Sequence, residues 1–304
     1  MAGAWHGERS IIATGDVTGP GIGGVLEALT GGATLIRASR ERLETLNLIN
    51  LFQPCQLTST PGVLGELIDR MDEHGIACPS VTTIRLVGSL VDEQVLRRID
   101  SHFDARIYVA YGAAEVGIVS GGALDPAAFR RGYVGRLVPA VKLVTSGTQA
   151  DPAPIVLVRD PETFNCYYVG GKVIPNTETF HMMPDLGYVE GDRLYLAGRD
   201  DEVLNISGNK IAFSVIDAEL RREPMVKDVA VVSAASLGDP SGVVIGVVTE
   251  GEADLPLLRD RVLRVVDAPS AAEHVRLFAL HVLPRNPFGK IDRARVIDLY
   301  GRST

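Results

Sequence analysis

The sequence is poor in several features that define specialised classes of protein. It has 3 cysteines and 1 tryptophan, aromatic residues make up 6% of the chain, and no apolar run reaches the length of a membrane span. Cys55, Cys78 and Cys166 are isolated and odd in number, which argues against a CxxC zinc site or a disulfide framework and indicates a reducing compartment. The first residues contain no basic segment leading into a hydrophobic signal core. We therefore expect a cytoplasmic protein without a membrane partner.

Positive charge is also in the minority. The chain has 30 Lys and Arg against 38 Asp and Glu, so its formal net charge is −8. An acidic protein is a poor general partner for the phosphate backbone of nucleic acids, and we expect no nucleic-acid partner. The 304 residues are 46% hydrophobic and 22% charged, which is typical of a compact globular protein with one large core or two domains.

The first hundred or so residues alternate strand-like and helical patterns. Apolar residues three and four positions apart predict a helix over 63–71. Strand alternating with helix is typical of an α/β fold with a mostly parallel sheet, in which ligands gather at the carboxyl ends of the strands. Short runs rich in β-branched residues predict the strands, at 10–14, 33–38, 55–60, 82–88 and 106–112.

The pattern changes after Tyr133. Strand-like runs joined by Gly, Pro, Asp and Thr predict a small antiparallel or barrel-like subdomain over about 133–198. Helical and strand-like runs then alternate again to the end of the chain, which indicates a small α+β domain. We predict the boundary near Arg199–Glu202, where a strand stops in a charged run. The domains expected are 1–199 and 200–304.

One glycine-rich run requires its own interpretation. GPGIGG at Gly19–Gly24 fits the G-x-G-x-x-G pattern of dinucleotide-binding folds and follows a predicted strand. However, Pro20 removes a backbone donor, and the next strand ends near Arg37 and Arg40 rather than at an acid. A dinucleotide-binding oxidoreductase is therefore a remote alternative. The other interpretation is that the glycines let a loop turn and a helix pack closely.

Three separated motifs carry the main functional signal. They are YGAAEVG at Tyr111–Gly117, DLGYVEGDRLYLAGRDDEVLNISGNKI at Asp185–Ile211, and LPRNPFGKIDR at Leu283–Arg293. In this order, with GYVGRLVPAVKLV at Gly132–Val144 between the first two, they resemble the adenylate-forming superfamily of acyl-CoA synthetases, nonribosomal-peptide adenylation domains and beetle luciferases. The resemblance covers nearly the whole chain.

The resemblance implies an acid–thiol ligase that forms AMP. Such enzymes join a carboxylic acid to ATP, expel pyrophosphate to give an acyl-adenylate, and pass the acyl group to coenzyme A or to the phosphopantetheine of a carrier protein. Lys290 resembles the family lysine that bridges the carboxylate and the α-phosphate. A compact ammonium on a flexible stem suits that role because two anions must approach each other.

The resemblance also implies roles for residues that hold the nucleotide. Asp185 matches the aspartate that binds the ribose hydroxyls, and Arg199 matches the arginine that assists it. Tyr111, followed by Gly112, is expected to stack on the adenine. Gly88 and Ser89 are expected to line the other side of the base.

Three further positions are assigned by the resemblance. Glu115 matches the catalytic acid that ligates Mg²⁺, a hard cation suited to carboxylate oxygen. Asp201 matches the hinge about which the small C-terminal domain turns. Gly208 matches the glycine beside the tunnel for the thiol.

The sequence departs from the family in ways that keep other functions open. No Ser/Thr/Gly-rich phosphate loop with an embedded lysine occurs in the 304 residues, so we expect a partial large domain, shortened at the amino end. Ala114, Met183 and Pro184 also replace residues that the family prefers. These departures are compatible with a specialised truncated enzyme, with a chain that has lost the activity, or with a fragment whose activity depends on an upstream polypeptide or a homo-oligomer. The alternative is a noncatalytic pseudoenzyme or subunit that binds an adenylate or a protein partner.

Overall fold

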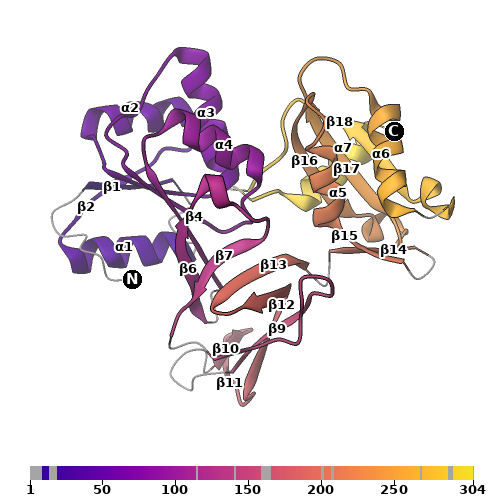
Figure 1. Cartoon of the computed structure of the whole chain (residues 1–304), viewed down its shortest axis with the longest axis horizontal. Coiled ribbons are helices and arrows are strands. Elements are labelled where there is room, and N and C mark those ends of the chain that lie inside the picture. The colour runs from indigo at the N-terminus through magenta and orange to yellow at the C-terminus, as the bar shows by residue number, and fades with distance from the viewer. Residues whose placement is uncertain are drawn as a thin grey trace. The chain divides into compact units, whose positions relative to one another are not determined.

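The chain divides into two compact units, each described separately below. The computed structural model describes residues 9–13, 19–113, 116–139, 142–158, 166–199, 202–206, 209–267, 269–286 and 290–303 (Figure 1). The first unit comprises Met1–Met183, Gly187–Leu196 and Pro287–Lys290. The second unit comprises Pro184–Leu186, Ala197–Asn286 and Ile291–Thr304. The predicted boundary after residue 199 stays a prediction.

A five-stranded parallel sheet opens the first unit. Its spatial order is β2-β1-β3-β4-β5, and four helices connect or precede its strands. This arrangement confirms the predicted α/β fold. The strands are β1 (Arg9–Ile12), β2 (Thr34–Arg37), β3 (Gln56–Ser59), β4 (Thr83–Val87) and β5 (Arg106–Ala113). The helices are α1 (Gly19–Gly31), α2 (Arg42–Phe52), α3 (Pro61–His74) and α4 (Glu93–His102).

Local sequence signals explain where α3 and α4 begin. The Thr60 side chain accepts a hydrogen bond from the backbone N–H of Val63, and Pro61 occupies the first helical turn, where its missing N–H costs nothing. The Asp92 carboxylate accepts from the N–H of Val95 at 2.8 Å. Gly75 ends α3 in the left-handed conformation at φ 62°. Helix α3 thus starts directly after β3, whereas a short loop separates α4 from β4.

Helices α2, α3 and α4 bury one face of this sheet. We call the buried apolar residues on this side the sheet core. On the strands they alternate with residues that point to the opposite face, as the pleat requires. Members include Ile11, Leu57, Ile84, Leu86, Ile107 and Val109 on the strands, and Leu46, Ile49, Leu64, Leu67, Ile68, Leu96 and Ile99 on the helices.

Helix α1 lies on the opposite side of the sheet (Figure 1). Its first turns contain the GPGIGG run, so these glycines are part of the helix. A Cβ at Gly24 would lie 2.4 Å from Cδ1 of Ile12 on β1. The absence of a side chain at Gly24 therefore lets α1 and β1 approach each other closely. The described contacts therefore favour a packing role for this glycine.

Antiparallel strands extend the parallel sheet to 11 strands. The order continues from β5 through β6-β7-β13-β12-β9-β8, and β10 and β11 form a separate hairpin. The strand-rich region that we predicted over 133–198 is thus joined to the parallel sheet through β6, which pairs with β5 on one side and with β7 on the other. The strands are β6 (Gly117–Leu124), β7 (Tyr133–Leu137), β8 (Leu143–Val144), β9 (Ala153–Val158), β10 (Cys166–Val169), β11 (Lys172–Pro175), β12 (Phe180–Glu190) and β13 (Arg193–Arg199), with η1 (Pro126–Ala128) between β6 and β7.

A second apolar cluster, which we call the strand core, lies among these antiparallel strands. It explains one departure from the family pattern. Met183 is 3% exposed and packs in this core, so an apolar side chain replaces the residue that the family prefers. The other buried members are Val119, Val134, Ile155, Leu157, Leu194 and Leu196.

The second unit is the small α+β domain that the sequence predicts. A three-stranded sheet, ordered β16-β17-β18, has buried apolar clusters on both faces, one with α5 and α6 and the other with α7. The strands are β14 (Val203–Ile206), β15 (Asn209–Ala212), β16 (Val226–Ser233), β17 (Val243–Thr249) and β18 (Val275–Ala279). The helices are α5 (Phe213–Leu220), η2 (Ala235–Leu237), α6 (Leu255–Val266), η3 (Pro269–Glu273) and α7 (Arg293–Ser303).

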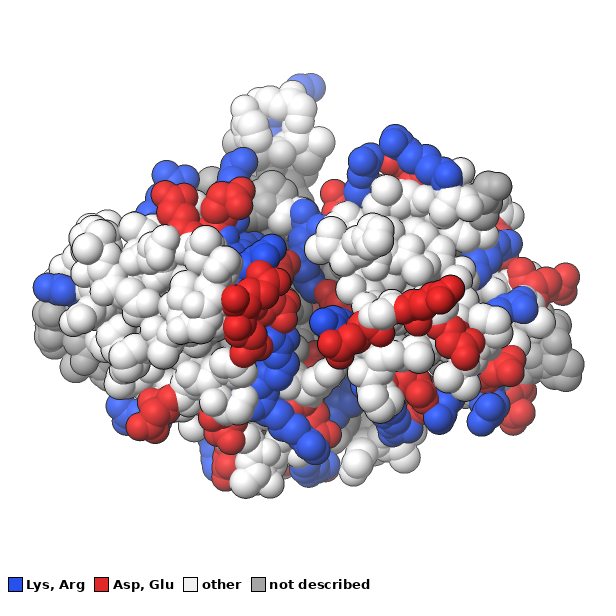
Figure 2. Space-filling model, turned by 90° about the horizontal axis from the view of Figure 1, so that it is seen from above, with Lys and Arg blue, Asp and Glu red and all other residues white. Residues whose placement is uncertain are grey.

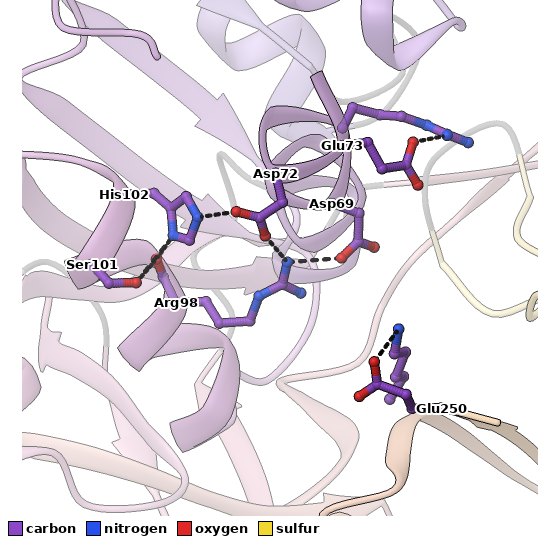
Figure 3. A network of polar contacts seen from close by, with 9 residues as sticks. Asp69, Asp72, Glu73, Arg98, Ser101, His102 and Glu250 are labelled. Carbon is purple, nitrogen blue, oxygen red and sulfur yellow. Dashed lines mark hydrogen bonds and ion pairs between the residues drawn. The ribbon is translucent and has the colours of Figure 1, made fainter. Parts of the chain in front are cut away.

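Polar contacts connect α3 to α4 on the outer side of the sheet core (Figure 3). His102 Nε2 lies 2.8 Å from Asp72 Oδ1, and Arg98 lies 2.7 Å from Asp69 and 3.7 Å from Asp72. The hydrogen bond to His102, with a smaller contribution from Arg98, lowers the pKa of Asp72. These contacts tie two helices whose apolar faces already meet.

The surface carries both signs of charge. Figure 2 shows acidic and basic side chains intermixed on the viewed face. Among the described residues, no helix combines the length and the apolar character that crossing a membrane requires.

Candidate functional site

Three adjacent parallel strands end at the same edge of the sheet. Ser59 pairs with Leu86, and Val87 pairs with Ala110, so the residues that follow lie close together. The candidate positions Gly88, Ser89, Tyr111 and Gly112 follow directly at this edge, as does Thr60. The carboxyl edge of a parallel sheet is the usual place for a ligand in such folds.

Gly88 brings Thr60 and Lys290 into the same place. Its backbone has φ 84°, a conformation that favours glycine. A Cβ at this position would lie 3.3 Å from Cγ2 of Thr60 and 3.7 Å from Cε of Lys290. Lys290 is exposed and is grouped with the first unit, like Gly88. The structure therefore brings together two candidate positions from distant parts of the sequence.

Tyr111 and Gly112 lie at an irregularity in the sheet. The register of β5 with β6 shifts between these two residues, and such bulges re-aim side chains. A Cβ at Gly112 would lie 2.0 Å from the carbonyl oxygen of Gly117, so a side chain cannot be placed there without moving the backbone. The partly buried Tyr111 packs against the strand core.

The segment that carries Lys290 is closed at its base. Arg285 and Ile291 form an antiparallel bridge, and the N–H of Asp292 donates to the carbonyl of Pro284 at 2.8 Å. Arg285 also pairs with Asp228 of β16 at 2.5 Å, and Arg221 pairs with the same carboxylate at 2.9 Å. The ends of this segment are therefore fixed by contacts within the second unit.

Asp185 and Arg199 belong to the second unit, apart from the edge residues of the first. Asp185 is partly buried on β12. Arg199 ends β13, and its Nε lies 3.4 Å from Glu202 Oε1. Arg293, the first residue of α7, pairs with the same carboxylate oxygen. Two guanidinium groups thus share Glu202.

Three candidate residues fall outside the described residues. These are Glu115, Asp201 and Gly208, so the predicted Mg²⁺ ligand, hinge and thiol-tunnel positions stay predictions; Ala114 lies outside them as well. Within the described part of the chain, no group of three or more His, Cys, Asp or Glu side chains could hold a metal ion.

Sequence reasoning missed two participants that the structure brings into view. Thr60 contacts the Gly88 position and also caps α3, and its place before Pro61 is a helix-start signal that could have identified it. Glu202 lies within the second motif, but its pairing with Arg199 and Arg293 depends on chain segments far apart. No local sequence pattern predicts that contact.

Comparisons with known proteins agree with the motifs and the fold. No family model matches the chain. It is 27% identical over 305 residues to the salicyl-AMP ligase / salicyl-S-ArCP synthetase of Mycobacterium tuberculosis, covering 92% of this chain and 52% of that protein. It is 26% identical over 293 residues to triostin synthetase I of Streptomyces triostinicus, covering 90% and 53%.

Solved structures share the fold. The O-succinylbenzoate coenzyme A synthetase of Bacillus subtilis, in complex with AMP, matches with a TM-score of 0.69 and 18% identity, covering 95% of this chain and 60% of that one. The chain spans about half the length of the curated relatives that it matches. In its motifs, its relatives and its fold, the chain is similar to adenylate-forming ligases.

Proposed function

We propose that this chain is the nucleotide-binding and acyl-activating part of an acyl-CoA synthetase-like ligase. In this function it binds AMP or an acyl-adenylate, takes part in the adenylation of a carboxylic acid, and transfers the acyl group to a thiol. The thiol is that of coenzyme A or of a carrier protein. The proposal is supported by relatives named as a salicyl-AMP ligase and a 4-chlorobenzoate–CoA ligase.

One observation carries the proposal. Gly88, Tyr111 and Gly112 lie at the carboxyl edge of the parallel sheet, and Cε of Lys290 lies 3.7 Å from the Cβ position of Gly88. An aromatic ring, a stretch of backbone without side chains and a cation are thereby grouped. These groups fit a nucleoside monophosphate, which has a flat base and an anionic phosphate.

The chemistry assigned to Lys290 follows from its charge. A carboxylate and an α-phosphate repel each other, and an ammonium between them offsets that repulsion as the new bond forms. The absence of a side chain at Gly88 leaves the space beside the lysine stem open to the ligand. Mg²⁺, when bound, would neutralise phosphate charge, and we assign its ligation to Glu115.

The remaining roles are proposed for the second unit. Asp185 is assigned to the ribose hydroxyls, because a carboxylate accepts two hydrogen bonds from a diol. Arg199 is assigned beside it, and Glu202 would hold its guanidinium before the nucleotide binds. Asp201 is assigned to the hinge and Gly208 to the thiol tunnel.

Calorimetric titration with AMP and ATP tests the nucleotide assignment. We expect Tyr111→Ala to weaken AMP binding by roughly 5- to 150-fold, the equivalent of about 1–3 kcal/mol of stacking, while Tyr111→Phe retains it. We also expect AMP and ATP to bind with similar affinity, because the assigned groups contact the base, ribose and α-phosphate. ATP binding 100-fold tighter than AMP would contradict this assignment.

The two half-reactions test the catalytic assignment. Lys290→Ala should lower the rate of acyl-adenylate formation by roughly 10²- to 10³-fold and leave thioester formation from a supplied acyl-adenylate nearly unchanged. Lys227→Ala, at an exposed lysine on β16, is the matched control. If the unmodified protein binds AMP but adenylates no acid, alone or with a partner polypeptide, the chain is a noncatalytic adenylate-binding protein.

A further inference from the structure

Helix α1 has its large apolar side chains on the outside. Ile22, Leu26 and Leu29 are spaced four and three residues apart, so they share one face of the helix. Their exposed fractions are 50%, 56% and 73%. The side toward the sheet has small residues instead, with Ala28 1% exposed and Gly24 against Ile12. A surface helix normally has the opposite arrangement, with its large apolar residues buried.

The sheet face beneath α1 differs from the face beneath the other helices. Because side chains alternate along a strand, the neighbours of Leu86 and Val109 point to the α1 side. There Arg85 pairs with Tyr108 across β4 and β5, and both remain partly exposed, whereas Ile12 and Thr58 on the same face are buried. Among the described helices of the first unit, α1 is the one on this face (Figure 1).

The five parallel strands form one part of the mixed 11-stranded sheet. Parallel strands joined by crossover helices are usually covered on both faces, because those helices pack on either side. An exposed apolar stripe beside an incompletely covered face marks an interaction surface. The second unit supplies the internal comparison, since its sheet has buried apolar clusters on both faces.

We propose that the α1 stripe, Ile22, Leu26 and Leu29, docks the polypeptide that corresponds to the other half of the curated relatives. The match to the salicyl-AMP ligase covers 92% of this chain but 52% of that protein, so a polypeptide of similar size remains unmatched. That polypeptide would add a layer over α1 and the Arg85–Tyr108 side of the sheet. The proposal deepens the proposed function by naming the partner that completes the ligase.

Complex formation tests the proposal. The probe is the polypeptide from the same genome that aligns with the unmatched half of the salicyl-AMP ligase, encoded in frame with this chain or separately. It is co-expressed with the tagged 304-residue chain, and the complex is measured by size-exclusion chromatography with light scattering. No nucleotide is added, so failure here is distinct from failure of the nucleotide assignment.

Two variants locate the interface. Leu26→Lys combined with Leu29→Lys should weaken the complex by 100-fold or more, because two charges would be buried in an apolar contact. Leu51→Lys, at a 72% exposed position of α2, is the matched control and should change affinity less than threefold. The three side chains are exposed in the free chain, so thermal melting should confirm that both variants fold.

Hydrogen exchange gives a second readout on the unmodified protein. The amides of α1 should gain protection in the complex, while those of α2 should not change. Four outcomes would overturn the proposal: a genome without such a polypeptide, no complex, a complex equally tight with the α1 double variant, or a homodimer of the wild-type chain that the double variant converts to monomer.

Discussion

The sheets of the two units are covered differently. In the second unit, β16–β18 lie between two apolar clusters, so every strand is buried from both sides. In the first unit, α2–α4 bury one face of the parallel sheet, whereas α1 contributes small residues inward and large ones outward. The α1 side of the first sheet is therefore covered less completely, since Ile12 and Thr58 are buried there but Arg85 and Tyr108 are partly exposed. That side is the one available to a further polypeptide.

The largest expected effect compares a leucine on each side of the first sheet. Leu64 of α3 is fully buried in the sheet core, and Leu64→Ala should lower the free energy of unfolding by about 2–5 kcal/mol. Leu29→Ala on α1 should change it by less than about 0.5 kcal/mol, because the side chain is 73% exposed. Urea denaturation measures both. Equal losses of unfolding free energy would mean that the two sides of the sheet contribute equally to stability.

A second prediction concerns how α1 sits on β1. Gly24→Val should destabilise the fold by about 1–3 kcal/mol, because the added methyl groups meet Ile12 at a position where even a Cβ would lie 2.4 Å away. Gly23→Ala should stabilise it by roughly 0.5–1 kcal/mol, since nothing lies within 4 Å and alanine favours a helix. Thermal denaturation of both variants tests whether α1 is seated as described. Similar effects of the two changes would contradict the close approach.

A smaller effect is expected at the cap of α3. Thr60→Ala removes the acceptor for the N–H of Val63 and should cost about 1 kcal/mol of unfolding free energy. Thr60→Ser retains the hydroxyl and is the control. Denaturation by guanidinium chloride distinguishes the two, and a loss common to both variants would point to the missing methyl group rather than the cap.

The smallest effect is a pH dependence that arises between α3 and α4. His102, and secondarily Arg98, lower the pKa of Asp72 below its unfolded value, so its stabilising contribution is present above pH 4 and is lost as pH falls through the folded pKa. The difference in stability between the wild type and Asp72→Asn should therefore shrink from pH 6 to pH 3. Urea titrations across this range measure it. A difference that grows on acidification would exclude this linkage.

Much of the first sheet could be predicted from the sequence because its signals are local. Runs such as 82–88 and 106–112 are rich in apolar and β-branched residues, and the 3.6-residue period of 63–71 lies within α3. Helix α1 could not be predicted in this way. Four glycines in its first six residues disfavour a helix, and packing against β1 overrides that preference.

The motif resemblance assigned residue types to the candidate site but gave no information on their arrangement. Gly112 is required because the carbonyl of Gly117 fills the place of a side chain, a contact created by the bulge between β5 and β6. The approach of Lys290 to Gly88 depends on how distant segments fold together. The motif resemblance named both residues, but spacing in the sequence contains no information on their separation.

The carboxylate of Asp228 sets an order in which the segment before α7 can be completed. Its pair with Arg221 spans 7 positions and can form as soon as α5 meets β16. Its pair with Arg285 spans 57 positions, so the loop-closure entropy is larger and the contact belongs to a later stage of folding. We therefore expect the base of the Lys290 segment to form after α5 and β16 have come together. An amino-acid change on β16 would delay or weaken this last step without touching the lysine.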